Sequence, residues 1–573
     1  MYSTMSDDPL TVARILRYGS TVQGASTVST WNGEQFESTT YAQVGERAAR
    51  LAHALRDRLN VRSGSRPQHE QSVVGTLMWN NTRHLELFLA VPAMGAVLHT
   101  LNPRMAPQQL AYIIEHAGDE VVIVDAGLVP TLAPLLPRLS GRLRHIVVAG
   151  PGGREALNGF TGEVHDYEEL LAHQPTNYPW QEHLDERTAA AMCYTSGTTG
   201  NPKGVIYSHR SIYLHCLQVA APSQYDLTAR EVLFPIAPMF HVNAWSIPHA
   251  AFFTGAGLLL ADRFAKAAPL ARMIEQGRPT FGAAVPTVWA GLLEELDAHS
   301  YDTGSLRRGL VGGNVCPPAL ISAYQERHSI ELRHAWGMTE TSSAVSTAVP
   351  PPGAEGRTEW TYRTSQGQFP ASVRFRLVGE DGAVLPNDGT ATGELQVRGP
   401  CVTAAYHGRT DGPPVRDVQH CTPDGWFKTG DIGRISPDGY LTLTDRAKDL
   451  IKSGGEFIST IELETHLTEH PAVIEAAVVA VPDDRWGERP LAVVSLRHGS
   501  DAGPEELRDF LAQHVESWTL PERWTALPVI PRNAVGKYDK RTIQEQYSSG
   551  RLDVVRLDKG PRQQSTTPIE PGR

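Results

Sequence analysis

Several features are scarce or missing in this 573-residue sequence. It has five cysteines, and no two of them stand in C-x-x-C spacing, which argues against a disulfide framework and against a zinc site of paired cysteines. No apolar run reaches the roughly 18 residues of a spanning helix, and the first residues, MYSTMSDDPLTVARIL, lack the apolar core of a secretory signal. We therefore expect a cytoplasmic protein with no transmembrane segment.

Charge is also spread without long runs of one sign. The net charge is -11, and lysine is rare: it supplies eight of the 52 basic residues. Nothing in this distribution provides the positive surface that a nucleic acid or an anionic membrane requires, so we expect no nucleic-acid partner. Six of the eight lysines fall in the short motifs described below. This placement suggests that the motifs need the compact, rotatable ammonium of lysine, which the planar guanidinium of arginine does not replace.

The length and the pattern of apolar residues indicate more than one domain of α/β type. A chain of 573 residues is too long for one hydrophobic core. From residue 42 to 150, amphipathic helical stretches alternate with short apolar runs, which predicts mostly parallel sheets flanked by helices. From about 371 the pattern changes to strands with tight turns, such as IGRISPDGYLTLTDR, which indicates a β-rich subdomain.

The last third of the chain contains a smaller unit. After DRAKDLIKSGGEFIS, two helical and two strand patterns follow within roughly 100 residues and predict a compact α+β domain. We place the large N-terminal domain at 1–445 and the small one at 446–550. Residues 551–573 are polar and rich in proline, and we expect them to be disordered.

One segment, YTSGTTGNPKGV at 194–205, has the composition of a phosphate-binding loop. It combines glycines, hydroxyls and a lysine after an apolar run. Backbone N–H groups in such a loop form a concavity that binds anions, and a lysine can follow the terminal phosphates of a nucleotide. The spacing differs from G-x-x-x-x-G-K-[ST], so the loop is not that of a P-loop NTPase. A solvated turn between two strands is the alternative interpretation.

Five further motifs follow this loop in a fixed order: PMFHVNAW (238–245), AWGMTET (335–341), GWFKTGD (425–431), DRAKDLIKSGGEFIS (445–459) and PRNAVGKYDKR (531–541). With these motifs the chain, from about residue 30 to 550, resembles the acyl-adenylate-forming superfamily of AMP-binding enzymes, and in particular its acyl-CoA ligases. The resemblance implies a large N-terminal domain and a small mobile lid. It also implies two reaction steps: ATP converts a carboxylate into an acyl-adenylate, and the thiol of coenzyme A then displaces AMP.

The resemblance assigns the nucleotide to residues from four motifs. Thr339 would contact the α-phosphate and Glu340 would hold Mg²⁺. Asp431 would accept hydrogen bonds from the ribose hydroxyls, and Arg446 would add a donor nearby. The phosphates would be held by Thr195, Ser196, Gly197, Thr198, Thr199, Gly200 and Lys203. The adenine would lie against Trp336, Gly337 and Met338, with Gly312, Gly313 and Asn314 along its edge.

The resemblance also assigns the two steps to different lysines. Lys537 would bridge the acyl carboxylate and the α-phosphate, where negative charges must approach each other. Lys448 stands where the family has its hinge, so that one cleft can take two closed arrangements. The tunnel for coenzyme A would be lined by Ser453, Gly454 and Gly455.

The acyl pocket is assigned to the PMFHVNAW motif. Phe240 and Val242 would line it as part of an aromatic wall near the carboxylate, and His241, beside Phe240, would be a catalytic residue together with Lys537, Thr339 and Glu340. Trp245 resembles a tryptophan that gates the acyl tunnel in the long-chain branch of the family, and packing in the core is the alternative. No acidic residue stands where it would bind an α-amino group, so a hydrophobic acid fits better than an amino acid.

The sequence and this resemblance therefore favour an ATP-dependent acyl-CoA ligase for a medium- or long-chain fatty acid. The alternatives are an adenylating enzyme for an aryl or alkylthio acid, and transfer of the acyl group to a carrier-protein phosphopantetheine. A catalytically silent homologue that binds nucleotide would lack a motif residue, and none is missing. The resemblance also allows a homodimer.

Overall fold

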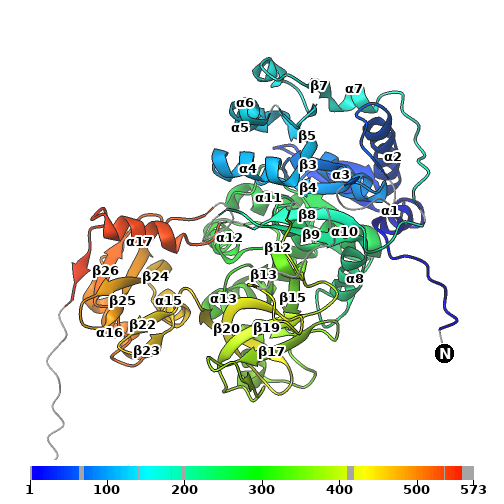
Figure 1. Cartoon of the computed structure of the whole chain (residues 1–573). Helices are drawn as coiled ribbons and strands as arrows, with labels where there is room; N and C mark the ends of the chain where they lie inside the picture. Colours follow the sequence, from blue (N-terminus) through cyan, green and yellow to red (C-terminus); the bar gives the residue numbers. More distant parts are fainter. Residues whose placement is uncertain are drawn as a thin grey trace, which may run out of the picture. The chain divides into compact units, whose positions relative to one another are not determined.

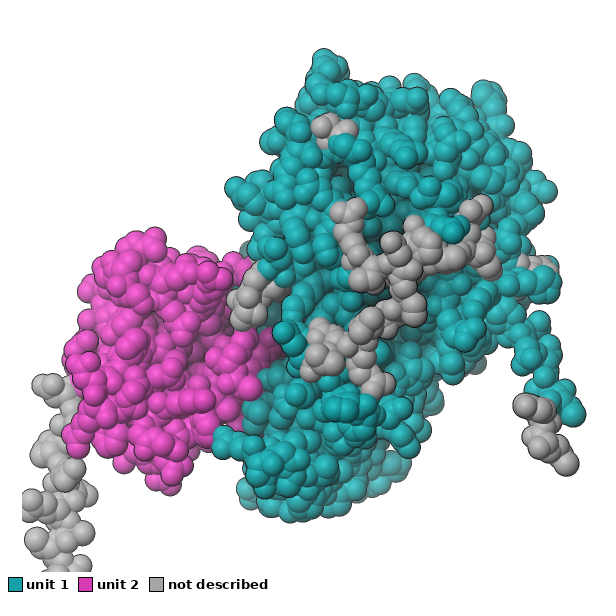
Figure 2. All heavy atoms as spheres, in the orientation of Figure 1, with its two compact units in different colours: residues 1–443, 534–537 teal, residues 444–533, 538–573 magenta. Residues whose placement is uncertain are grey.

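The computed structural model describes residues 3–63, 70–139, 141–181, 183–195, 201–408, 419–497, 499–533 and 536–557. The chain divides into two compact units, drawn in separate colours in Figure 2. Residues 1–443 and 534–537 form unit 1, and residues 444–533 and 538–573 form unit 2. Among the described residues, no helix has the length and apolar character needed to cross a membrane.

Unit 1 contains a seven-stranded sheet that is parallel except at one edge, as the alternating pattern predicts (Figure 1). The strands inside the sheet are rich in valine, isoleucine and alanine and are buried on both faces, which is the usual state of a parallel sheet, whereas the edge strand β7 is partly exposed. The last pair, β8 and β9, is antiparallel and carries the phosphate-loop motif. In sheet order the strands are β7 Glu163–Asp166, β6 His145–Ala149, β5 Asp119–Asp125, β3 Val73–Leu77, β4 Val97–Thr100, β8 Ala189–Tyr194 and β9 Gly204–Ser208.

A second, fourteen-stranded sheet joins a parallel part to the antiparallel strands of the β-rich region. The parallel part ends at the AWGMTET motif, where β14 turns back into β15. In sheet order the strands are β18 Val384–Leu385, β17 Arg374–Val378, β19 Gly393–Arg398, β20 Phe427–Ile435, β21 Tyr440–Arg446, β16 Gly367–Gln368, β15 Ser343–Thr347, β14 Glu331–Met338, β13 Arg308–Gly312, β12 Phe281–Ala284, β10 Val232–Pro235, β11 Gly257–Leu260, β1 Thr27–Trp31 and β2 Phe36–Thr40.

Helices connect and cover these strands (Figure 1). Several begin with the capping chemistry that their sequence predicts; Thr40, for example, forms a reciprocal capping box with Gln43 at the start of α2. The helices of unit 1 are α1 Val12–Thr21, α2 Tyr41–Asp57, α3 Thr82–Ala93, α4 Pro107–Ala117, α5 Val129–Leu132, α6 Leu136–Leu139, α7 Tyr167–Leu171, α8 His209–Ala220, α9 Val242–Trp245, α10 Ile247–Thr254, α11 Ala267–Gly277, α12 Pro286–Ala298, α13 Pro318–His328 and α14 Gly356–Thr364.

Unit 2 is a small sheet with three helices, and its core contains Trp524 and the inward faces of α15 and α16. Its longest strands, β24 and β25, form an antiparallel pair. The elements are β22 Ile451–Ser453, β23 Glu456–Ile458, α15 Thr460–Glu469, β24 Val473–Asp483, β25 Gly487–Leu496, α16 Pro504–Leu511, β26 Arg523–Ala526, α17 Lys540–Ser548 and β27 Val555–Arg556. The predicted α/β fold class, with a β-rich region and a small α+β unit, is confirmed.

The expected disorder from residue 551 is wrong for its first residues. Val555 and Arg556 form β27, which pairs antiparallel with Trp524 and Arg523 of β26. A β-branched valine has high strand propensity, and pairing with β26 satisfies its backbone groups. The polar composition of the segment hid this short strand, and residues 558–573 lie outside the described residues.

Candidate active site

The phosphate-loop motif begins where β8 ends and returns to β9. Tyr194 is paired with Gly204, and beyond this pair the Thr195 N–H donates to the Lys203 carbonyl at 2.9 Å. The Lys203 N–H in turn donates to Thr195 Oγ1 at 3.3 Å. The base of the loop is therefore closed by two hydrogen bonds that hold Thr195 beside Lys203. Ser196, Gly197, Thr198, Thr199 and Gly200 lie outside the described residues.

Tyr406 lies between two of the predicted ligands of the phosphates and metal. The Lys203 ammonium is 4.8 Å from the centre of the Tyr406 ring, and Lys203 Nζ is 2.9 Å from His420 Nε2. The Tyr406 hydroxyl donates to Glu340 Oε1 at 2.6 Å. One tyrosine thus presents its face to the cation and its hydroxyl to the carboxylate.

The segment that carries Tyr406 is fixed by backbone hydrogen bonds at both ends. The Thr403 N–H donates to the Glu340 carbonyl, and the His407 N–H donates to the Gly204 carbonyl, each at 2.7 Å. Tyr406 is not among the residues that the sequence motifs predict. Its surroundings, TAAYHG, offer only an aromatic residue in a loop as a signal, and its partners are 66 and 203 positions away in the chain.

Thr339 and Glu340 occupy a single 3₁₀ turn, Thr339–Thr341, directly after β14, and both are buried. The Tyr207 hydroxyl donates to the Thr339 carbonyl at 2.8 Å. Gly337 precedes the turn, at a point where β14 and β15 lie very close together. A Cβ atom on Gly337 would lie 2.0 Å from the Ser343 carbonyl oxygen, so only glycine fits. The Met338 N–H donates to Thr341 Oγ1 at 3.0 Å, which orients the turn.

Trp336 and Asp431 are joined directly. The indole Nε1–H donates to Asp431 Oδ2 at 2.8 Å, and both side chains are buried. The Asp431 N–H is fixed to Thr429 Oγ1 at 3.1 Å, and the Trp336 ring meets the ring of Phe369 edge on at 5.9 Å. This tryptophan therefore holds the aspartate that the sequence analysis assigned to the ribose.

The glycines assigned to the adenine edge end strand β13. Gly312 is paired with Ala335, and a Cβ atom on Gly312 would lie 2.9 Å from the Ala335 carbonyl oxygen. Gly313 has φ +87°, a left-handed conformation that glycine adopts without strain. The next residue is Asn314, whose carbonyl oxygen lies 3.3 Å from His334 Nε2 of β14.

The residues assigned to the acyl pocket are apolar and mostly buried. Phe240 packs edge on against Trp79 at 6.1 Å, and the Arg104 guanidinium lies 5.7 Å from the centre of its ring. Val242 and Trp245 belong to the central hydrophobic cluster of unit 1. His241 is half-buried; burial, and secondly the positive charge of Lys537, lower its pKa to about 3, so its imidazole is neutral near pH 7.

The backbone of this motif is left-handed over five successive residues. Val242, Asn243, Ala244, Trp245 and Ser246 have φ values of +46°, +50°, +47°, +56° and +62°. None is glycine, and a left-handed turn costs roughly 1–2 kcal/mol for each such residue. Asn243 is the type best suited to this conformation, and its Oδ1 accepts a hydrogen bond from Cys193 Sγ at 3.2 Å. Strain of this kind is concentrated at functional sites.

The hinge and tunnel candidates lie on unit 2. The Arg446 N–H donates to Asp445 Oδ1 at 2.7 Å, and Lys448, whose side chain is 43% exposed, has its ammonium 4.0 Å from Asp449 Oδ1. Ser453 Oγ accepts from Arg489 Nη1 at 3.1 Å. Gly454 and Gly455 have φ of +64° and +95° and form the two-residue turn between β22 and β23.

The structure thus joins several of the predicted site residues within unit 1, and others belong to unit 2. It brings Thr195 and Lys203 together, connects Lys203 to Glu340 through Tyr406, and connects Trp336 to Asp431. Lys537 groups with unit 1, where its charge acts on His241. The candidates Arg446, Lys448, Ser453, Gly454 and Gly455 form a separate set within unit 2.

Comparisons with known proteins identify the family of the chain. Residues 21–407 match the family described as AMP-binding enzyme, and residues 462–537 match the AMP-binding enzyme C-terminal domain. The chain is 39% identical over 554 residues to a 3-methylmercaptopropionyl-CoA ligase of Ruegeria pomeroyi, covering 96% of this chain and 99% of the relative. It is 41% identical over 557 residues to a long-chain-fatty-acid–CoA ligase of Thermus thermophilus, covering 96% and 97%.

A solved structure shows the same fold. The anthranilate CoA ligase AuaEII in complex with anthranoyl-AMP superposes with a TM-score of 0.81 at 23% identity, over 95% of this chain and all of that one. The order of the motifs, the fold and the similarity over nearly the full length all agree. The chain belongs to the AMP-binding enzyme family, and within it to the AMP-forming acid–thiol ligases.

Proposed function

We propose that this chain activates an apolar carboxylic acid, with a medium- or long-chain fatty acid favoured, and transfers it to coenzyme A. The observation that carries the proposal is the contact of Tyr406 with both Lys203 and Glu340. It gathers a cation and a carboxylate beside a loop suited to phosphates. A carboxylate is a poor electrophile, and its conversion to an acyl-adenylate requires the phosphates of ATP to be held and neutralised.

The proposed roles follow the chemistry of each group. The 195–203 segment would hold the β- and γ-phosphates, and Thr339 the α-phosphate. Asp431, oriented by Trp336, would accept from the ribose hydroxyls. Gly312, Gly313 and Asn314 would lie along the edge of the adenine, where the two glycines have no side chains and leave space.

Glu340 fits the Mg²⁺ ion that this family implies. Its Oε1 accepts from the Tyr406 hydroxyl, while Oε2 has no hydrogen-bond partner within the part of the chain that the structure describes. A carboxylate oxygen is the ligand that Mg²⁺ prefers. When bound, the ion supplies positive charge that lowers the cost of releasing pyrophosphate.

Lys537 is proposed as the group that stabilises the attack of the carboxylate on the α-phosphorus. Its charge acts on His241, in the motif assigned to the acyl pocket. Because the His241 pKa is lowered to about 3, the imidazole adds no second charge near pH 7. The ammonium of Lys537 would then be the cation that offsets the negative charges as they approach.

The preference for an apolar acid rests on the side chains of the pocket motif. Phe240, Val242 and Trp245 are apolar and buried, and the charged group beside them is the Arg104 guanidinium, 5.7 Å from the centre of the Phe240 ring. Relatives with similar coverage carry the names long-chain-fatty-acid, medium-chain-fatty-acid and 3-methylmercaptopropionyl-CoA ligase. The third of these names keeps a short alkylthio acid as the second candidate.

The second half-reaction is assigned to unit 2. We propose that Lys448 is the hinge and that the Ser453–Gly455 turn borders the path of the pantetheine thiol. Gly454 and Gly455 have no side chains, so their backbone forms a narrow turn. Gly454 packs against Trp486, because a Cβ atom on Gly454 would lie 2.6 Å from the Trp486 ring. A carrier-protein phosphopantetheine is the alternative acceptor.

Pyrophosphate release over a panel of acids tests the proposal. The purified chain would be given ATP, Mg²⁺ and, in turn, acetate, octanoate, palmitate, benzoate, an amino acid and 3-(methylsulfanyl)propanoate. The proposal expects the largest kcat/KM with octanoate or palmitate. The largest value with the alkylthio acid would favour the second candidate, and no release with any acid would contradict both. Coenzyme A and a loaded carrier protein, offered side by side, identify the acceptor.

A further inference from the structure

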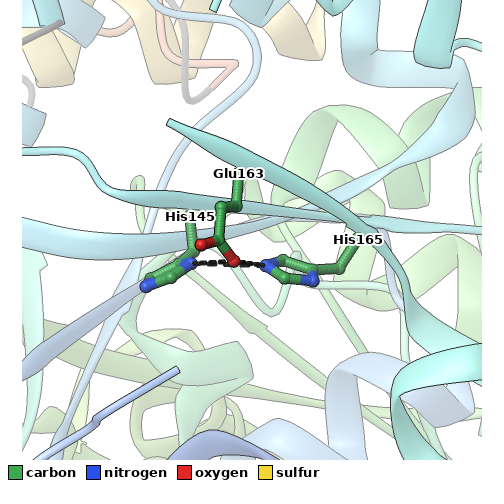
Figure 3. Close-up of side chains that lie close together, drawn as sticks. All are labelled: His145, Glu163 and His165. Carbon is green, nitrogen blue, oxygen red and sulfur yellow. Dashed lines mark hydrogen bonds and ion pairs between the residues drawn. The ribbon is translucent and has the colours of Figure 1, made fainter. Parts of the chain in front are cut away.

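Three potential metal ligands lie together at the edge of the seven-stranded sheet, on residues that the ligase site does not use. His145 begins β6, and Glu163 and His165 lie on the edge strand β7. In the parallel register His145 is paired with Glu163, and Val147 with His165. Because side chains alternate between faces along a strand, all three point to the same face of the sheet. Figure 3 shows both imidazole rings directed at the Glu163 carboxylate.

The three donor atoms have the spacing of a coordination site. His145 Nδ1 is 3.2 Å from His165 Nε2, and Glu163 Oε2 lies 3.7 Å from the first and 3.4 Å from the second. The centre of this triangle lies about 2.0 Å from each atom, which matches the bonds of about 2.0–2.2 Å that Zn²⁺ forms with imidazole and carboxylate ligands. An ion there would need almost no rearrangement of the side chains.

The protonation states suit a metal ion. Burial lowers the pKa of both His145 and His165 below the usual value, so each imidazole is neutral at pH 7 and has a lone pair to offer. Around them, Glu163 and Glu120 raise the histidine pKa values and Arg144 and Arg58 lower them, so charges of both signs face the pair. Glu163, 69% exposed, would supply the one negative ligand.

We propose that His145, Glu163 and His165 form a binding site for a divalent transition-metal ion of the Zn²⁺ type, with a water molecule in the remaining position. Two imidazoles and one carboxylate favour such an ion over Mg²⁺ or Ca²⁺, which prefer oxygen ligands. The ion would join the edge strand β7 to β6. It would stabilise the folded chain because the unfolded chain does not hold the three ligands together.

A second group in unit 2 provides a contrast. His466, Glu469 and His514 also lie close together. Their two imidazole rings stack at 4.8 Å with an angle of 14° between the planes, which sets the ring faces against each other. The donor atoms of this second group also lie within 4.8 Å of one another, whereas in β6 and β7 the two ring nitrogens are 3.2 Å apart and both rings are directed at the carboxylate. His514 therefore serves as the matched control.

The test is a titration of the full-length chain, stripped of metal with a chelator, with ZnCl₂ at pH 7.5 by isothermal calorimetry. We expect one saturable site and a rise in the melting temperature with Zn²⁺. Removal of groups that only orient metal ligands weakens binding about 10- to 100-fold, so removal of a ligand in His165→Ala should cost at least about tenfold. His514→Ala should bind as the unaltered chain does.

Glu163→Gln tests the site with little change in shape. It should also weaken binding about tenfold or more while leaving ligase activity unchanged, since the loss of the charge removes the anionic ligand. Co²⁺ should give a visible absorption spectrum that His165→Ala loses. The proposal fails if the unaltered chain has no site with a Kd below about 0.1 mM, if both variants at 163 and 165 bind equally tightly, or if His514→Ala abolishes the binding.

Discussion

Trp336 donates its indole N–H to Asp431 Oδ2 at 2.8 Å, across 95 residues of sequence, and both side chains are buried. This hydrogen bond is one of the contacts that orient the buried carboxylate. Since Asp431 is the proposed ligand of the ribose, the tryptophan would act on ATP through the aspartate.

Trp336→Phe should therefore weaken ATP binding while leaving the acid site unchanged. A hydrogen bond to a charged group contributes about 1.5–3 kcal/mol, so KM for ATP should rise about tenfold or more. The matched control is Trp426→Phe, whose indole lies under the Arg376 guanidinium at 4.5 Å. Steady-state kinetics with ATP and acid varied separately make the measurement. A rise in KM for the acid alone would contradict the assignment.

Tyr406→Phe should reduce adenylation and raise the Mg²⁺ concentration that half-activates the enzyme. The ring, and with it the contact to Lys203, would remain, whereas the hydroxyl that orients Glu340 would be lost. We expect kcat to fall about tenfold or more, which corresponds to at least about 1.4 kcal/mol. Tyr362→Phe is the control, because its hydroxyl donates to an exposed carboxylate, that of Asp438, at 2.7 Å. Equal effects of the two variants would argue against a role for Tyr406.

Unit 1 should lose stability between pH 6.5 and about pH 4. Its buried histidines have pKa values lowered by burial to about 4 or about 3: His84, His209, His215, His249 and His334. In the unfolded chain these histidines have the ordinary pKa of about 6.5 and bind protons below it, whereas in the folded chain they stay neutral. The free energy of unfolding is therefore highest above pH 6.5 and decreases as the pH is lowered. Each histidine contributes a slope of up to about 1.4 kcal/mol per pH unit.

Urea unfolding at pH 7.5 and at pH 5.5 checks this dependence. The midpoint should fall clearly at pH 5.5, and His249→Gln should reduce the fall. His173 is exposed, and His173→Gln should leave the fall unchanged. Identical midpoints at the two pH values would show that these histidines do not control acid stability.

Lys540 should be a strong determinant of the stability of unit 2. Its ammonium lies 2.7 Å from Glu464 Oε1 and donates to Thr460 Oγ1 at 2.6 Å, and the Thr460 N–H donates to Asp445 Oδ2. Burial alone would lower the Lys540 pKa, and the carboxylates of Glu464 and Asp445 raise it instead. Lys540→Met leaves these carboxylates without their cation, at an expected cost of about 3–5 kcal/mol.

The neighbouring Arg541 gives the control in the same helix. It pairs with Glu545 at 2.9 Å on the surface, and Arg541→Met should cost less than about 0.5 kcal/mol. Hydrogen exchange of the backbone amides in α15, β24 and α17 measures both variants. Faster exchange with Arg541→Met than with Lys540→Met would refute this account of the Lys540 pair.

Much of the fold could be predicted because its signals are local. Apolar runs of β-strand length mark the parallel strands. The positive φ values of Gly454 and Gly455 are expected for two successive glycines in a turn. The order of the motifs also led to the family. The short strand at Val555 escaped prediction because its stability comes from pairing with β26, which the local composition does not reveal.

The contacts within the site could not be predicted in this way. Tyr406 meets Glu340, and Trp336 meets Asp431, through turns that bring distant segments together. The left-handed run from Val242 to Ser246 was equally hidden. Valine and tryptophan disfavour positive φ, so only the surrounding packing can hold them there.

The most direct test of the central claim is a separate measurement of the two half-reactions in Lys537→Ala. We predict that pyrophosphate release falls about 10²- to 10³-fold, which is the usual effect of losing one preorganised donor. Thioester formation from supplied acyl-adenylate should remain near that of the unaltered enzyme. Lys448→Pro, which alters the proposed hinge, should show the reverse. Equal loss of both half-reactions in Lys537→Ala would contradict the account.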